Sequence, residues 1–198
     1  MTPTADQVRR AWASLPGMFG AIVLNKHSGL GAVPAQAVAK VLVTLGVMSN
    51  EDFLNKTATT LYGAILVPFV PGTIHAYFNL VSQLTTLAHE LEHVVQFREH
   101  PLGFPFEYLV DSRQRAIAEV DAMKPALLLR HQIEPLKGSP AEVAARYAAK
   151  LSTYRCDEDD IETAKSLLTP FVTSVLAGAE TSRRYPQVAA ILDAMGAA

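Results

Sequence analysis

Apolar residues recur at intervals of three and four near the middle of the chain, and this spacing predicts an amphipathic helix. The apolar positions are Leu84, Leu87, Ala88, Leu91, Val94 and Val95. No proline or glycine occurs between Ser82 and His100, so the helical pattern contains no internal breaker. A proline follows His100 directly and favours an end to the helix at that point.

The residues before this helix have a different pattern. Residues 57–69 are rich in β-branched and aromatic types, which favours one or two strands. Pro68 suits an edge strand, because proline lacks the N–H that a central strand needs. An edge strand beside a helix can pair with an extended peptide. Residues 21–24 are also compatible with a strand.

Further helices are expected along most of the remaining chain. Their approximate ranges are 4–14, 34–46, 115–129, 139–153, 159–168, 170–178 and 185–195, with shorter helical stretches at 51–54 and 107–115. We expect Pro16 and Gly17 to end the first helix and Pro125 to interrupt the one over 115–129. Residues 102–106 are predicted to form an apolar loop. The pattern as a whole predicts a mostly helical α+β fold with a small β-sheet.

The chain has 198 residues and is expected to form a single domain. Its core is predicted at about residues 57–130, with a C-terminal helical extension at about 139–198. The longest apolar run, residues 61–70, contains Gly63 and Pro68 and is too short to span a bilayer.

Composition and charge narrow the class of protein. The net charge of −2 gives no reason to expect nucleic acid or acidic membranes as partners. A single cysteine, Cys156, excludes an internal disulfide framework and a cysteine-based zinc site. No basic segment leads into an apolar core at the N-terminus, so no secretory signal is apparent. We expect a soluble protein, either cytoplasmic or exported without a recognisable signal peptide, of unspecified oligomeric state.

The predicted central helix carries the chemistry. His89, Glu90 and His93 form the pattern H-E-x-x-H. Four residues make just over one helical turn, so the two imidazoles lie on one face and can converge on one ion. This is the geometry that Zn²⁺ needs from its first two ligands. Glu90 follows the first ligand directly, where its carboxylate can act as the general base toward a metal-bound water.

A catalytic zinc site needs a third protein ligand. The metzincin pattern requires a glycine and a histidine at the positions that Gln96 and Glu99 occupy here, so that class is excluded. Glu119 follows after enough chain for a turn, a loop and the start of a second helix, and alanines around it permit close helix packing. Glu119 is therefore the expected third ligand. Asp121 is the alternative, either as ligand or as an acceptor for an imidazole N–H.

These residues resemble a known family. The stretch from Ala88 to Gln96 is similar to the A-H-E-x-x-H-V-x-Q core of the small bacterial and phage zincin-like metallopeptidases of the gluzincin type. The stretch Glu119–Ala122 resembles the E-x-[DE]-A sequence on the second helix of that family. The resemblance covers roughly residues 57–124. It implies a zincin-like fold, Zn²⁺ held by His89, His93 and Glu119, and Glu90 as general base, but little about the substrate.

The expected function is hydrolysis of peptide bonds in a peptide or protein substrate. Tyr108, Arg113, Arg115 and His131 are candidates by residue type for the donor that stabilises the oxyanion. Gln96 lies on the ligand face and is a candidate to orient a ligand or substrate.

Two other functions stay open at this point. One is a zincin-like metal-binding protein without turnover, acting as a binding or structural module. The other assigns partner docking to the C-terminal helices, with the metal site supporting their placement. A Glu90→Gln variant distinguishes an enzyme from a binding protein.

Overall fold

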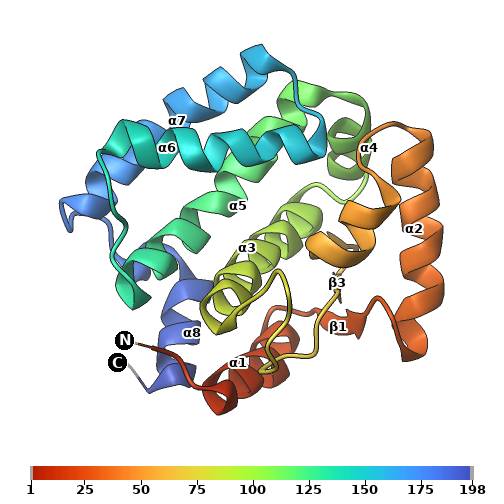
Figure 1. The fold of residues 1–198 in the computed structure, drawn as a ribbon, viewed down its shortest axis with the longest axis horizontal. Coiled ribbons are helices and arrows are strands. Elements are labelled where there is room, and N and C mark those ends of the chain that lie inside the picture. Colours follow the sequence, from red (N-terminus) through yellow and green to blue (C-terminus); the bar gives the residue numbers. More distant parts are fainter. Residues whose placement is uncertain (1, 197–198) are drawn as a thin grey trace.

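The computed structural model describes residues 2–196, in which helices surround a three-stranded sheet (Figure 1). The helices are α1 (Ala5–Met18), α2 (Ala32–Thr44), α3 (Leu80–Glu99), α4 (Gly103–Val110), α5 (Ser112–Ile133), α6 (Pro140–Ala148), α7 (Glu158–Leu176) and α8 (Pro186–Met195). The strands are β1 (Ile22–Asn25), β2 (Thr59–Leu61) and β3 (Ala64–Val67). Short helical segments add Gly29–Gly31, the π-type turn Asp52–Lys56, Ala149–Tyr154 and Ser182–Arg184. The prediction of a mostly helical α+β fold with a small sheet is confirmed.

Strand β3 is the centre of the sheet, with β1 parallel on one side and β2 antiparallel on the other. The turn between β2 and β3 consists of Tyr62 and Gly63, with φ values of 45° and 80°. Two positive φ values are the mark of a type I′ turn, whose twist matches a tight hairpin. Pro68 comes directly after the last residue of β3. The prediction that Pro68 lies in an edge strand is therefore wrong, because Pro68 follows the central strand β3. The sheet edge that faces α3 is formed by β2.

Helix α3 runs through the middle of the molecule, with α5 packed along one side and β2 on another (Figure 1). Its predicted apolar face is buried, and Leu84, Leu87 and Leu91 are among the most deeply buried side chains. Asn79 caps its first turn by accepting a hydrogen bond from the Ser82 N–H. This burial fixes which face of α3 is turned toward the sheet and α5.

The C-terminal helices are continuous with this core. Val120 and Leu127 of α5 pack with Leu168 and Val172 of α7 in a second apolar cluster, which also contains Cys156. At the other end of the molecule α8 packs against α1 and α3 (Figure 1). Within residues 2–196, each helix is too short or too polar to cross a lipid bilayer.

Prolines break fewer helices than the local sequence predicts. Helix α1 continues through Pro16 to Met18, α5 continues through Pro125, and α7 spans Pro170. Residues 102–106, predicted as a loop, are mostly the first turn of α4. A proline inside a helix costs about 3 kcal/mol. In α5 the burial of the leucines at 127–129 offsets this cost, because they reach the core only if the helix continues past Pro125.

Candidate metal centre

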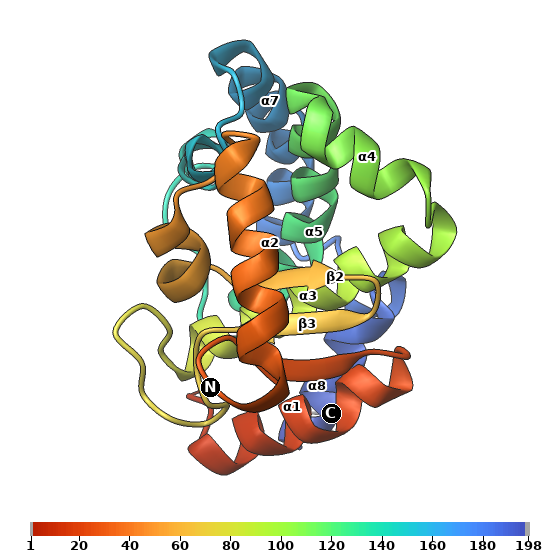
Figure 2. The ribbon, with the colours of Figure 1, turned by 90° about the vertical axis from the view of Figure 1, so that its right-hand side faces the viewer.

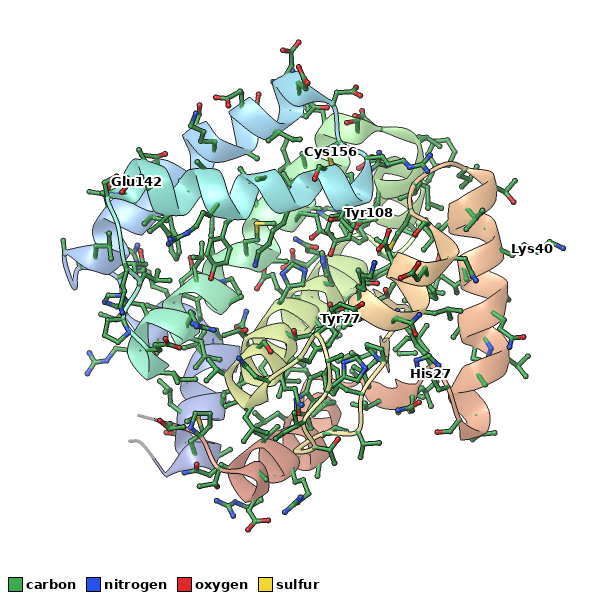
Figure 3. The ribbon with its side chains drawn as sticks, in the orientation of Figure 1. His27, Lys40, Tyr77, Tyr108, Glu142 and Cys156 are labelled. Atoms are coloured by element: carbon green, nitrogen blue, oxygen red, sulfur yellow. The ribbon has the colours of Figure 1, made fainter. Side chains whose placement is uncertain are left out.

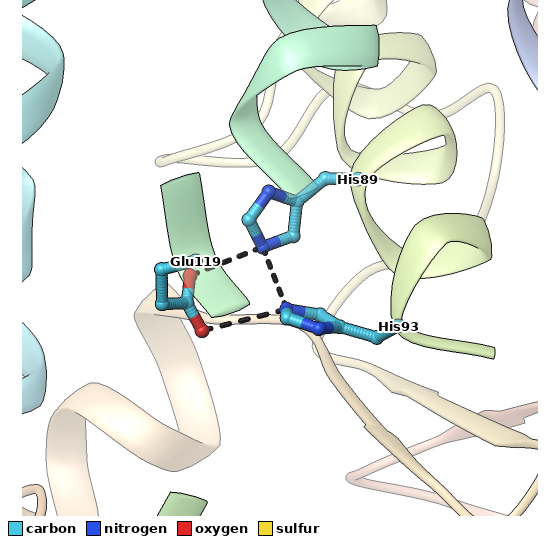
Figure 4. Close-up of side chains that lie close together, drawn as sticks. All are labelled: His89, His93 and Glu119. Atoms are coloured by element: carbon cyan, nitrogen blue, oxygen red, sulfur yellow. Dashed lines mark hydrogen bonds and ion pairs between the residues drawn. The ribbon is translucent and has the colours of Figure 1, made fainter. Parts of the chain in front are cut away.

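Three side chains from two helices converge between α3 and α5 (Figure 4). His89 and His93 come from consecutive turns of α3, and their Nε2 atoms lie 3.1 Å apart. Glu119 comes from α5 and places Oε2 3.3 Å from Nε2 of His89 and Oε1 3.4 Å from Nε2 of His93. The close packing of the two helices, through small residues such as Ala118 and Ala122, brings these groups together.

The spacing fits a tetrahedral cation. Bonds of about 2.0–2.1 Å to a tetrahedral zinc ion place neighbouring ligand atoms about 3.3–3.4 Å apart. The two imidazole Nε2 atoms lie 3.1 Å apart, and each lies 3.3–3.4 Å from a different oxygen of the Glu119 carboxylate. Glu119 is 1% exposed, and its Oε2 atom is shielded from solvent and accepts no hydrogen bond. A cation at the centre of the cluster satisfies this oxygen, as a buried carboxylate requires.

Gln96 holds one of the imidazoles in place. Its Oε1 lies 2.7 Å from Nδ1 of His93, and its Nε2 donates to the Ala118 carbonyl oxygen at 3.1 Å. Because an amide oxygen only accepts, Nδ1 of His93 donates this hydrogen bond, so the neutral form of His93 carries its lone pair on Nε2, facing Glu119. Gln96 therefore links α3 to α5 and selects the histidine tautomer that can ligate a metal.

The charges in the cluster are strongly coupled. Burial lowers the pKa of His93, but the Glu119 carboxylate, with support from Glu90 and Gln96, raises that pKa to about 9. Burial favours the neutral form of Glu119, yet the two histidines hold its pKa far below the ordinary value. A metal cation and a proton therefore compete for the same lone pairs.

Tyr108 supplies a hydroxyl beside the cluster. It lies in the interior at the inner side of α4 (Figure 3), and its Oη donates to Oε1 of Glu119 at 2.5 Å. Burial and the neighbouring Glu119 charge raise the pKa of Tyr108 well above its usual value, so the hydroxyl keeps its proton. Arg115 fixes the end of α4 by donating to the carbonyl oxygens of Tyr108 and Leu109.

Glu90 lies beside the cluster without belonging to it. It is 3% exposed and lines the same cavity as the two histidines and Glu119. Thr60 on β2 donates to Oε2 of Glu90 at 2.8 Å, and the Thr60 hydroxyl also lies 3.2 Å from the Glu90 carbonyl oxygen. The carboxylate is thus held from the sheet side.

Lys26 is buried between the end of β1 and the segment that leads into β2. Its ammonium donates to the carbonyl oxygens of Phe53 and Thr57, at 2.6 and 3.0 Å, and to Oγ1 of Thr59 at 3.3 Å. It also lies 3.6 Å from the centre of the Phe53 ring. Burial lowers the pKa of Lys26 to about 7, against the opposing effect of the Glu90 charge. Lys26 therefore ties the end of β1 to the segment that leads into β2.

The other residues singled out from the sequence lie elsewhere. Asp121, the alternative ligand, is 45% exposed at its side chain and pairs with Lys124 at 2.6 Å. Arg113 is exposed, and Nδ1 of His131 accepts from the Leu136 N–H away from the cavity. Of the four candidates for an oxyanion donor, the structure brings Tyr108 alone to the cavity.

Sequence reasoning missed Thr60, which contacts Glu90, and Lys26, which holds the segment that leads into β2. The contacts of both residues depend on how β2 is placed between β3 and α3, and no local sequence pattern predicts that placement. For Lys26 the available signal was a lysine directly after an apolar strand. For Thr60 there was almost no signal, because a threonine is common in a short strand.

Comparison with known proteins gives no match among family models, curated proteins or solved structures.

Proposed function

We propose that this chain is a zinc-dependent peptidase with a zincin-like fold, in which His89, His93 and Glu119 hold the ion. The observation that carries the proposal is the convergence of these three groups at the spacing of a tetrahedral ion, with the Glu90 carboxylate in the same cavity. Three protein ligands leave one position free for water, as a catalytic site requires.

The side chains around the cluster have distinct tasks. When bound, zinc lowers the pKa of a coordinated water toward neutrality and polarises the carbonyl under attack. Glu90, held by Thr60, accepts the proton of the attacking water and later passes it to the leaving amine. The protonated Tyr108 hydroxyl turns from Glu119 to donate to the oxyanion.

Strand β2 supplies a place for the substrate main chain. In a two-residue hairpin the residues that flank the turn exchange both hydrogen bonds, so the next pair, Thr60 and Ile65, points its N–H and C=O groups outward. Among the described residues β2 pairs with β3 alone. Thr60 also lines the cavity that holds Glu90, so these outward groups are placed to pair with an extended peptide inside it, which supports strand addition beside Glu90.

Zinc content and hydrolysis by the purified chain test the proposal. We expect one zinc ion per chain and hydrolysis of dye-labelled casein. Glu90→Gln should keep the zinc and lose hydrolysis by about 10²–10⁴-fold, because general base catalysis has that magnitude. Glu99→Gln, at the exposed end of the same helix, is the matched control. A fully active Glu90→Gln variant contradicts the role of Glu90. A chain that binds zinc without turnover is the metal-binding alternative.

A further inference from the structure

A cavity of about 300 Å³ lies beside the candidate ligands and reaches away from them. Helix α2 forms one wall, and β2, α3 and α4 form the others, with Tyr154 at one side. Figure 2 shows α2 crossing in front of β2 and β3, which agrees with residues of both elements lining this space. The apolar part of the wall includes Val38, Leu42, Met48, Phe97 and Phe104.

The charges in the cavity are confined to the candidate metal centre. Apart from His89, Glu90, His93 and Glu119, the described residues that line it are apolar side chains, threonines and tyrosines. The Tyr108 hydroxyl already donates to Glu119. A carboxylate or ammonium that enters the apolar part loses its hydration and gains no partner there. An apolar group gains from leaving water.

We propose that this cavity takes a large apolar side chain, of the leucine, methionine or phenylalanine class, from an internal stretch of an extended polypeptide. The proposal rests on the proposed peptidase function and names the substrate residue next to the bond that is cut. A volume of about 300 Å³ is at the small end for ligand sites, which suits one side chain and its adjoining backbone. The edge of β2 that faces away from β3 lines the same cavity and holds that backbone.

The lack of a lysine or arginine among the described lining residues also bears on whether the chain cleaves substrates internally or at an end. A peptidase that removes C-terminal residues needs a positive group for the terminal carboxylate. No lysine or arginine is among the described residues that line the cavity. Outside the candidate metal centre the described lining also holds no carboxylate for an N-terminal ammonium, so it favours cleavage within a chain, where the flanking peptide groups are uncharged.

Helix α2 sets the size of the accepted side chain. This helix lies outside residues 57–124, so it belongs to the part of the chain that the zincin-like resemblance does not cover. Val38 is half-buried on α2 and lines the cavity. Val33, on the same helix, is 76% exposed and does not line it. Val38→Phe narrows the cavity, Val38→Ala widens it, and Val33→Phe is the matched control.

Mass spectrometry of a peptide mixture cut by the zinc-loaded full chain tests the inference. We expect cuts beside leucine, methionine or phenylalanine, with kcat/KM about tenfold or more above the alanine equivalent. Amidation of the peptide C-terminus should leave the rate unchanged. Val38→Phe should shift the preference to alanine and Val38→Ala toward tryptophan, while Val33→Phe should not. Three results would each overturn the inference. They are cleavage beside charged residues, a requirement for a free C-terminal carboxylate, and a side-chain preference that is unchanged in the Val38 variants.

A binding measurement separates this inference from the proposed function. Nuclear magnetic resonance spectra of the chain without added metal are recorded with acetylated, amidated Ala-Leu-Ala or Ala-Asp-Ala. We expect the leucine peptide alone to shift the signals of Val38 and Met48. Leucine binding without any hydrolysis would leave the pocket standing and remove the peptidase function. Binding of decanoate but not of the leucine peptide would assign the cavity to an acyl chain and overturn the inference.

Discussion

The Thr60 hydroxyl donates a hydrogen bond to Oε2 of Glu90 across 2.8 Å, from the edge strand of the sheet to the helix that carries the candidate ligands. The two residues are 30 positions apart in the chain. Their contact requires the β2–β3 hairpin to hold its register, because a shift by one residue would turn the Thr60 side chain to the other face. The proposed general base is thus oriented by the fold as a whole.

Thr60→Val should remove this orientation while keeping the shape of the side chain. Hydrogen bonds to charged groups contribute about 1.5–3 kcal/mol, so we expect a loss of about that size in the free energy of unfolding and about a tenfold or greater loss in kcat. Zinc affinity should not change, because Glu90 is not a ligand. Urea unfolding, hydrolysis rates and zinc titration measure the three quantities.

Two further variants complete this experiment. Thr60→Ser keeps the hydroxyl and should restore kcat. Thr85→Val, which removes a hydroxyl bonded only to the Ser82 carbonyl on the same helix, should have little effect on hydrolysis. Unchanged kcat in Thr60→Val would show that Glu90 does not depend on this contact.

Lys26 should make stability depend on pH in the alkaline range. The pKa of Lys26 is about 7 in the folded chain, against an ordinary value of 10.5 for an unperturbed lysine. Between these pH values the unfolded chain therefore binds more protons than the folded chain. The free energy of unfolding therefore rises with pH across that window, by up to about 1.4 kcal/mol per pH unit from this group. Below pH 7 both states carry the proton, and the contribution of Lys26 is constant.

Urea unfolding between pH 6 and 10 measures this dependence. Lys26→Met should flatten the rise relative to the parent chain. Lys40→Met removes a lysine that points outward from α2 (Figure 3) and should leave the slope unaltered. Parallel curves for the parent and Lys26→Met would contradict the shifted pKa.

The site illustrates what a local pattern can and cannot report. The apolar spacing around Leu87 and Leu91 predicts α3 and its buried face, because helix period and burial are local and agree here. The pairing of α3 with the helix that carries Glu119 follows from chain length and small residues nearby. These features were enough to nominate the three groups that the structure brings together.

Features that depend on distant packing were not predictable. Pro125 lies within α5 because burial of the following leucines outweighs a local cost. The contacts of Thr60 and Lys26 follow from the order of the strands, which the residues of β2 do not encode by themselves. The α2 wall of the cavity comes from a segment remote from the motif in sequence.

Gln96 should control metal affinity without being a ligand. Its amide oxygen accepts from Nδ1 of His93 and its amide N–H group donates to the Ala118 carbonyl. Loss of such a partner typically costs 10–100-fold in affinity, so Gln96→Ala should weaken zinc binding by about that factor. Competition with a chromogenic chelator measures it, and Gln114→Ala at an exposed position of α5 is the control. Equal affinity in Gln96→Ala and the parent would dismiss this role.

Glu119 and Asp121 should differ sharply in their effect on zinc. Glu119 lies between the two imidazoles, whereas Asp121 pairs with Lys124 toward solvent. Glu119→Ala leaves two ligands, and we expect the zinc content after dialysis to fall from one ion per chain to a small fraction. Asp121→Ala should retain the full content. Circular dichroism must show that both variants are folded, since Glu119→Ala also deprives Tyr108 of its acceptor. Full zinc in a folded Glu119→Ala variant, or its loss in Asp121→Ala, would move the third ligand away from Glu119.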